Sequence, residues 1–71
     1  EEQAERYIRL LTSGFEEIAE EPIRGRLCND IREGYWKLRI GHHVIFYRTE
    51  DTGVIDVVRV LHEKMDFARH L

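Results

Sequence analysis

The run from His43 to Thr49 constrains the fold most, because its side chains are apolar on both faces of an extended chain. Val44 and Phe46 belong to one face, and Ile45 and Tyr47 belong to the other. This pattern is typical of a strand in the middle of a sheet. It leaves the register of residues 43–49 open, because a one-residue slip would still bury apolar side chains.

Two further strands are predicted around this run. Residues 35–40 alternate, with Trp36, Leu38 and Ile40 on one face and Tyr35, Lys37 and Arg39 on the other. Gly41-His42 fits a two-residue hairpin turn in which glycine supplies the positive φ of type II′. Glu50–Gly53 is a second turn, and Val54–Leu61, rich in β-branched residues, is a third strand. The three strands would form an antiparallel meander.

The first 20 residues predict an amphipathic helix. Its apolar residues recur at three- and four-residue steps: Ala4, Tyr7, Ile8, Leu11, Phe15, Ile18 and Ala19. Glu1, Glu2 and Glu5 favour the helix start through its dipole. Gly14 costs about 1 kcal/mol relative to alanine, and Pro22 ends the helix.

The remaining segments are less periodic. Ile23–Glu33 predicts a loop with Ile23, Leu27 and Ile31 turned inward. The tail, His62–Leu71, predicts a short helix carrying Met65, Phe67 or Ala68, and Leu71. The expected fold class is therefore α+β: a single domain over residues 1–71, with an N-terminal helix packed on a three-stranded antiparallel meander and a short C-terminal helical tail.

Charge and cysteine content limit the classes of function. The net charge is −3, with five basic and nine acidic groups in residues 1–33, so we expect a protein partner rather than direct sequence-specific binding of nucleic acid. Cys28 is the only cysteine, which excludes an internal disulfide. The sequence has no apolar run long enough to cross a bilayer and no secretory signal at its start, so we expect no membrane association and a cytoplasmic location.

The histidines do not have the spacing of metal ligands. His42 and His43 are adjacent at the hairpin, where surface positions are ordinary, and strand neighbours point to opposite faces. His62 and His70 are eight residues apart, which is too remote for a standard ligand pair. We therefore expect no metal and no other cofactor.

Several runs together resemble the ParE branch of the ParE/RelE toxins. They are Gly41–Arg48, Val57–His62, the ending His62–Leu71, and the upstream Glu2–Ile8. The resemblance implies a RelE/ParE-like fold and a toxin of a bacterial type II toxin–antitoxin module. Such a toxin would poison DNA gyrase by binding, would catalyse no reaction of its own, and would be neutralised by a ParD-like antitoxin.

ParE-like proteins open with a strand and a first helix, and this sequence begins at the helix that would follow them. The resemblance therefore implies a truncated chain that self-associates or is covered by a partner, with a homo-oligomer expected in the absence of antitoxin. Two alternatives stay open. One is a RelE-like ribosome-dependent mRNA endonuclease, for which Arg48, Arg59, His62 and Lys64 could supply the acid, base and cation. The other is a non-toxic fragment that only binds antitoxin.

No catalytic residue is predicted, but a set of partner-binding residues is. Its members are Lys37, Arg39, Arg48, Arg59, His62, Lys64, Met65, Arg69 and His70. Within this set the tail residues Lys64, Met65, Arg69 and His70 are expected to contact the target. Residues 35–40, read as an edge strand with Lys37 and Arg39 outward, could accept an extended peptide by strand addition.

Overall fold

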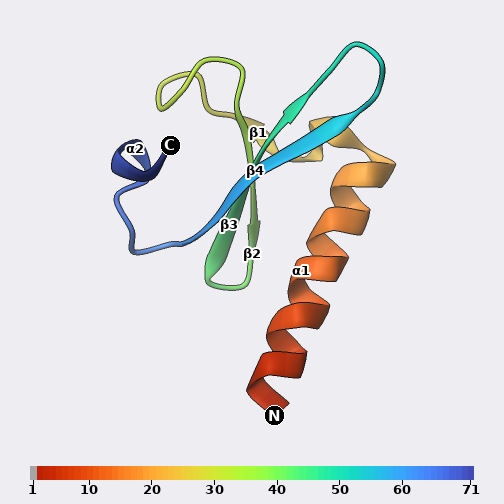
Figure 1. Ribbon diagram of the computed structural model, residues 1–71, viewed down its shortest axis with the longest axis vertical. Coiled ribbons are helices and arrows are strands. Elements are labelled where there is room, and N and C mark those ends of the chain that lie inside the picture. The colour runs from red at the N-terminus through yellow and green to blue at the C-terminus, as the bar shows by residue number, and fades with distance from the viewer. Residues whose placement is uncertain (1) are drawn as a thin grey trace.

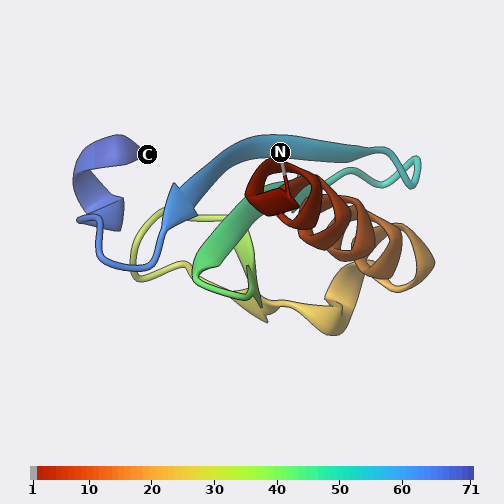
Figure 2. The same cartoon turned by 90° about the horizontal axis from the view of Figure 1, so that it is seen from below.

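The computed structural model describes residues 2–71. The elements in chain order are α1 (Glu2–Glu20), the 3₁₀ turn η1 (Pro22–Arg24), β1 (Arg26–Leu27), β2 (Trp36–Ile40), β3 (His43–Thr49), β4 (Ile55–His62) and α2 (Phe67–His70). The strands form one antiparallel sheet in the order β1-β2-β3-β4, with α1 on one side and α2 on the other (Figure 1, Figure 2). The α+β class is confirmed, and the predicted helix start at Glu1 lies outside the described residues.

Strand β3 is the centre of the molecule, as its two apolar faces predicted. On one face Val44 and Phe46 are buried with Cys28 and Leu61. On the other face Ile45 and Tyr47 are buried with Ile18 of α1, and the predicted Trp36, Leu38 and Ile40 face of β2 packs there. Burial on both faces is the physical reason that this strand is apolar throughout.

The register that the pattern left open is set by the hairpin between β2 and β3. Ile40 pairs with His43, so only Gly41 and His42 form the loop. Gly41 has φ of 61° and His42 has no positive φ, as a type II′ turn requires. The turn length therefore decides which side chains of β3 share a face with those of β2.

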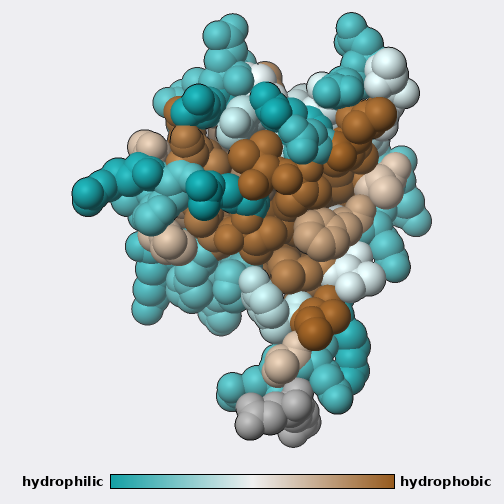
Figure 3. All heavy atoms as spheres, in the orientation of Figure 1, coloured by the Kyte–Doolittle hydropathy of each residue, from teal (hydrophilic) through white to brown (hydrophobic). Residues whose placement is uncertain are grey.

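Helix α1 crosses the sheet at Gly14, which approaches Ile45 so closely that an added Cβ would lie 2.7 Å from Ile45 Cδ1. Among residues 3–20 of the helix, Gly14 and Ile18 are the buried ones, and the helix ends before Pro22 as predicted. The full apolar stripe is not buried, however: Ile8 is 61% exposed and Phe15 39% exposed. The sheet covers only the part of the stripe centred on Gly14. Figure 3 shows apolar side chains at the surface over the middle of the molecule.

Residues 23–33 differ from the predicted loop. Arg26 and Leu27 form a fourth strand that pairs with Lys37 and Trp36 of β2. Ile23 and Leu27 are exposed rather than turned inward, and Ile31 alone of the three packs against the core. The small side chain of Cys28 is the fully buried one. Strand β2 consequently has neighbours on both sides at Trp36 and Lys37, where its prediction as an edge strand was wrong. No strand pairs with residues 38–40 on that side within the described residues.

Candidate partner-binding face

Four of the predicted partner-binding residues lie on one face of the sheet. Lys37 pairs with Phe46, and Phe46 pairs with Arg59, so all three side chains share a face. Arg39 lies opposite Val44 and Arg48 opposite Asp56, on the same face. This is the face on which α2 packs. The sheet thus places Lys37, Arg39, Arg48 and Arg59, spread over 23 positions of sequence, on one surface.

Arg48 is already engaged within the sheet. Its Nη2 donates to Asp56 Oδ2 at 2.6 Å, and its guanidinium lies 5.5 Å from the centre of the Tyr35 ring. The hydrogen bond to Asp56 raises the pKa of Arg48 above its ordinary value. These contacts link the end of β3 to the start of β4, so Arg48 has a structural role on this face.

The tail is anchored by its apolar residues. The Phe67 ring meets the Phe46 ring edge to face with centroids 5.0 Å apart, and Leu71 packs against the same cluster. Arg32 Nη1 donates to the Leu71 carbonyl at 2.7 Å. The tail residues predicted for target contact are all exposed: Lys64, Met65, Arg69 and His70. The prediction of Met65 as an apolar residue of the tail helix is wrong, because Met65 lies before α2 and is 39% exposed.

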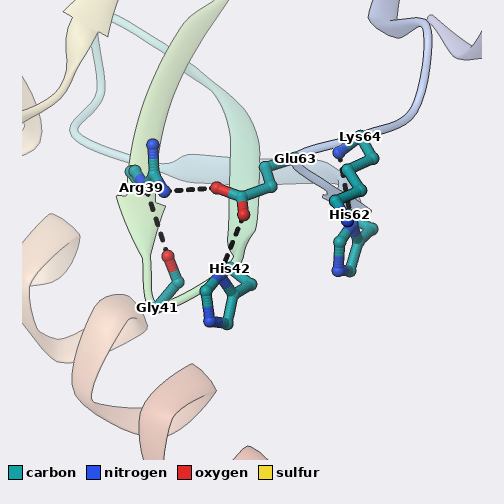
Figure 4. A network of polar contacts seen from close by, with 6 residues as sticks. All are labelled: Arg39, Gly41, His42, His62, Glu63 and Lys64. Carbon is teal, nitrogen blue, oxygen red and sulfur yellow. Dashed lines mark hydrogen bonds and ion pairs between the residues drawn. The ribbon is translucent and has the colours of Figure 1, made fainter.

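Glu63 joins the tail to the hairpin, and the sequence reading did not single it out (Figure 4). Its carboxylate forms an ion pair with Arg39 and a 2.8 Å contact with His42 Nδ1. Its amide N–H donates to the His42 carbonyl at 2.8 Å. The hydrogen bond from His42, helped by Arg39, lowers the pKa of the Glu63 carboxyl. Glu63 comes just after the third predicted strand, whose end lies beside the basic hairpin of the first two strands in an antiparallel meander. This position is the signal that could have identified Glu63.

The histidines next to this network form a cluster. His43 and His62 are paired across β3 and β4, with ring centroids 5.3 Å apart, and the His42 ring stacks on His62 at 6.4 Å. His43 also meets Tyr7 of α1 edge to face at 4.7 Å. His62 Nδ1 accepts a hydrogen bond from the Lys64 amide at 3.2 Å, which ties His62 to the turn that follows β4.

The cluster and the basic face lie on opposite sides of the sheet. His62 pairs with His43, on the α1 side, whereas Arg59 pairs with Phe46, on the α2 side. Alternation along β4 therefore keeps the Arg59 and His62 side chains apart. Within residues 2–71 no group of three or more His, Cys, Asp or Glu side chains has the arrangement of a metal site.

Cys28 is separate from these polar groups. Its thiol is buried and donates to the Tyr35 carbonyl at 3.2 Å. Burial raises the pKa of the thiol, which keeps it protonated and a poor nucleophile. Cys28 is therefore a packing residue of the α2 side of the sheet.

An N-terminal helix packed on an antiparallel sheet, followed by a short C-terminal helix, is the RelE/ParE-like fold. Residues 1–67 match the family model described as the ParE toxin of the type II toxin-antitoxin system parDE. The chain is 50% identical over 70 residues to Toxin ParE1 of Mycobacterium tuberculosis, covering 99% of this chain and 71% of that protein. It is 42% identical over 71 residues to Toxin ParE1 of Caulobacter vibrioides, with the same coverage of both chains.

The chain belongs to the ParE toxin family, and it is a toxin of the type II toxin–antitoxin class. The family predicted from Gly41–Arg48 and the runs around it is therefore confirmed. In the part of the chain that the structure describes, none of the helices has the length and apolar character needed to cross a bilayer.

Proposed function

We propose that this toxin poisons DNA gyrase by binding it, and that a ParD-like antitoxin neutralises the toxin. Membership of the ParE toxin family is the observation on which the proposal rests. The proposal includes a cytoplasmic location for the toxin, because gyrase and its DNA are found there. Action by binding alone is supported by the separation of Arg59 and His62 on opposite sides of the sheet.

The tail is our candidate for the gyrase contact. Phe67 and Leu71 fix it to the core, so its outward residues are presented on an ordered support. Lys64 and Arg69 add positive charge there, and Met65 adds exposed apolar surface. An anchored segment with exposed charged and apolar side chains loses little entropy on binding.

A gyrase assay with matched variants tests this proposal. Purified toxin should inhibit supercoiling and leave linear DNA after the complexes are denatured and digested with protease. Lys64→Glu combined with Arg69→Glu should require about tenfold more protein for the same effect, because both cations of the tail are reversed. Arg6→Glu with Arg9→Glu, an equal charge change on α1, should act like the parent chain. Unaltered gyrase activity with the parent chain would disprove the proposal.

A ribonuclease would need its cation and its base to act on the same phosphate. Arg59 and His62 lie on opposite faces of β4, which does not suit this requirement. Ribosome-dependent mRNA cleavage that is lost on Arg59→Ala and on His62→Ala would favour a RelE-like activity over gyrase poisoning. We expect no cleavage by the parent chain.

Antitoxin binding is proposed independently of toxicity. A non-toxic chain that still binds the antitoxin would form a stable complex yet leave growth and gyrase unaffected. Growth and gyrase assays distinguish a toxic chain from a non-toxic one, and light scattering with and without antitoxin tests whether the complex forms. Light scattering also tests the predicted homo-oligomer, which should dissociate as the complex forms. The exposed Ile8 and Phe15 support the expectation that another surface covers α1.

A further inference from the structure

The chain turns directly after β4, and the turn carries two of the residues proposed for the gyrase contact. The Met65 amide donates to the His62 carbonyl at 3.0 Å, which closes a turn over residues 62–65. The Lys64 amide donates to Nδ1 of the His62 ring at 3.2 Å (Figure 4). His62 therefore accepts hydrogen bonds from the amides of both exposed residues, one with its backbone and one with its side chain.

The imidazole of His62 does here what a short polar side chain usually does in such a turn. Asn, Asp and Ser are favoured at the first position of a turn, because their side chains accept a hydrogen bond from the amide two residues later. Nδ1 of a histidine is separated from Cα by the same number of bonds as Oδ1 of an asparagine. It can accept a hydrogen bond when the neutral ring carries its proton on Nε2.

Neighbouring rings hold the His62 side chain in this position. His43, which pairs with His62 across the sheet, meets it edge to face with centroids 5.3 Å apart, and the His42 ring stacks on it at 6.4 Å. His43 in turn contacts Tyr7 of α1. Packing against two rings restricts rotation of the imidazole, so Nδ1 stays directed at the Lys64 amide.

The segment after His62 is fixed at both ends and exposed between them. At one end the Glu63 carboxylate is bound to the hairpin, and at the other the Phe67 ring packs against the core. Lys64 and Met65 lie between these points and are exposed. The hydrogen bonds to His62 fix the backbone that carries these two side chains.

We propose that His62 is a positioning residue of the tail, and this role rests on the proposed gyrase function. Nδ1 of His62 holds the Lys64 amide and so presents Lys64 and Met65 to gyrase in a fixed arrangement. A segment that is already ordered loses less conformational entropy on binding than a mobile one. His62, predicted from the sequence as a partner-binding residue, then acts through the turn and does not itself touch gyrase.

Three variants separate positioning from direct contact in the supercoiling assay. His62→Phe keeps an aromatic ring beside His42 and His43 but removes the acceptor, so about fivefold more protein should be needed for the same inhibition. His62→Asn restores an acceptor for the Lys64 amide and should act within about twofold of the parent chain. His43→Phe makes the same ring change at the neighbouring position and should also match the parent chain.

Amide hydrogen exchange followed by NMR gives a readout that does not involve gyrase. The Lys64 amide should exchange about fivefold faster in His62→Phe than in the parent chain, because it loses its acceptor. His62→Asn should restore the slower exchange. Amides of the central strand β3 should stay protected in both variants, which identifies both as folded.

Each contrary result has a distinct meaning. Equal potency of His62→Phe and the parent chain, or unchanged exchange of the Lys64 amide, would overturn the positioning role. An equal loss of potency in His62→Asn would also overturn it, because the imidazole itself would then contact gyrase. The same loss in His43→Phe would overturn it in favour of ring packing. A parent chain without effect on gyrase would instead remove the gyrase function, and the positioning role with it.

Discussion

The Tyr47 hydroxyl donates a hydrogen bond of 2.7 Å to the carbonyl of Pro22, which follows the end of helix α1. The same oxygen accepts a 3.2 Å hydrogen bond from the Gly25 amide, and the Tyr47 side chain is fully buried. One side chain of the central strand thus satisfies two backbone groups of the segment between α1 and β1. Burial raises the pKa of this phenol, so it stays protonated and able to donate.

Tyr47→Phe should therefore destabilise the protein by about 1–3 kcal/mol, because the Pro22 carbonyl and the Gly25 amide lose their partner in a buried site. Denaturant unfolding followed by circular dichroism measures the change. Tyr7→Phe, at a more exposed ring, is the matched control and should change stability by less than about 0.5 kcal/mol. Equal effects of the two substitutions would contradict the assigned role of Tyr47.

Gly14→Leu should destabilise the protein by about 1–3 kcal/mol through overpacking, although leucine favours helices more than glycine does. The reason is the 2.7 Å approach that a Cβ would make to the buried Ile45. Ser13→Leu, one residue earlier on the exposed side of α1, serves as the control. Thermal unfolding should show a lower Tm for the first variant only. A higher Tm for Gly14→Leu would mean that α1 does not lie so close to the sheet.

The Glu63 network should make stability depend on pH in the acid range. The pKa of the Glu63 carboxyl is lowered in the folded state. The contribution of this carboxylate to stability is therefore complete above the ordinary carboxyl pKa of about 4.3, and it is lost as pH falls through the lowered value. Glu63→Gln should thus lower Tm near neutral pH and have little effect in strong acid. Glu33→Gln, in the loop before β2, provides the comparison. A difference in Tm that is constant from neutral to acid pH would argue against this network.

The Cys28 thiol should react slowly with thiol reagents in the folded protein. It is buried, and its raised pKa limits the fraction of thiolate. We expect a rate about tenfold or more below that of the denatured chain. Because its folded pKa is raised, the contribution of the neutral thiol to stability is complete below the unfolded pKa and is lost as pH rises through the folded value. Rapid labelling of the folded protein near neutral pH would show that Cys28 is accessible.

Local patterns along the chain were enough to predict α1, β2, β3 and β4 and to identify the family. Residues 43–47, apolar on both faces, identified the central strand, Pro22 marked the end of the helix, and Gly41-His42 marked the hairpin. The runs from Gly41 onward identified the ParE toxins. Each of these depends on local spacing, which is readable along the chain.

Contacts between side chains that are distant in the sequence followed from the tertiary fold. The two-residue strand β1 has no pattern of its own and exists because it pairs with β2. Pairing then sets Arg26 against Lys37, while alternation along β4 separates Arg59 from His62. The contacts of Glu63 with Arg39 and His42 span more than 20 positions of sequence. Such contacts arise from sheet register and chain reversal, which the composition of a single segment does not determine.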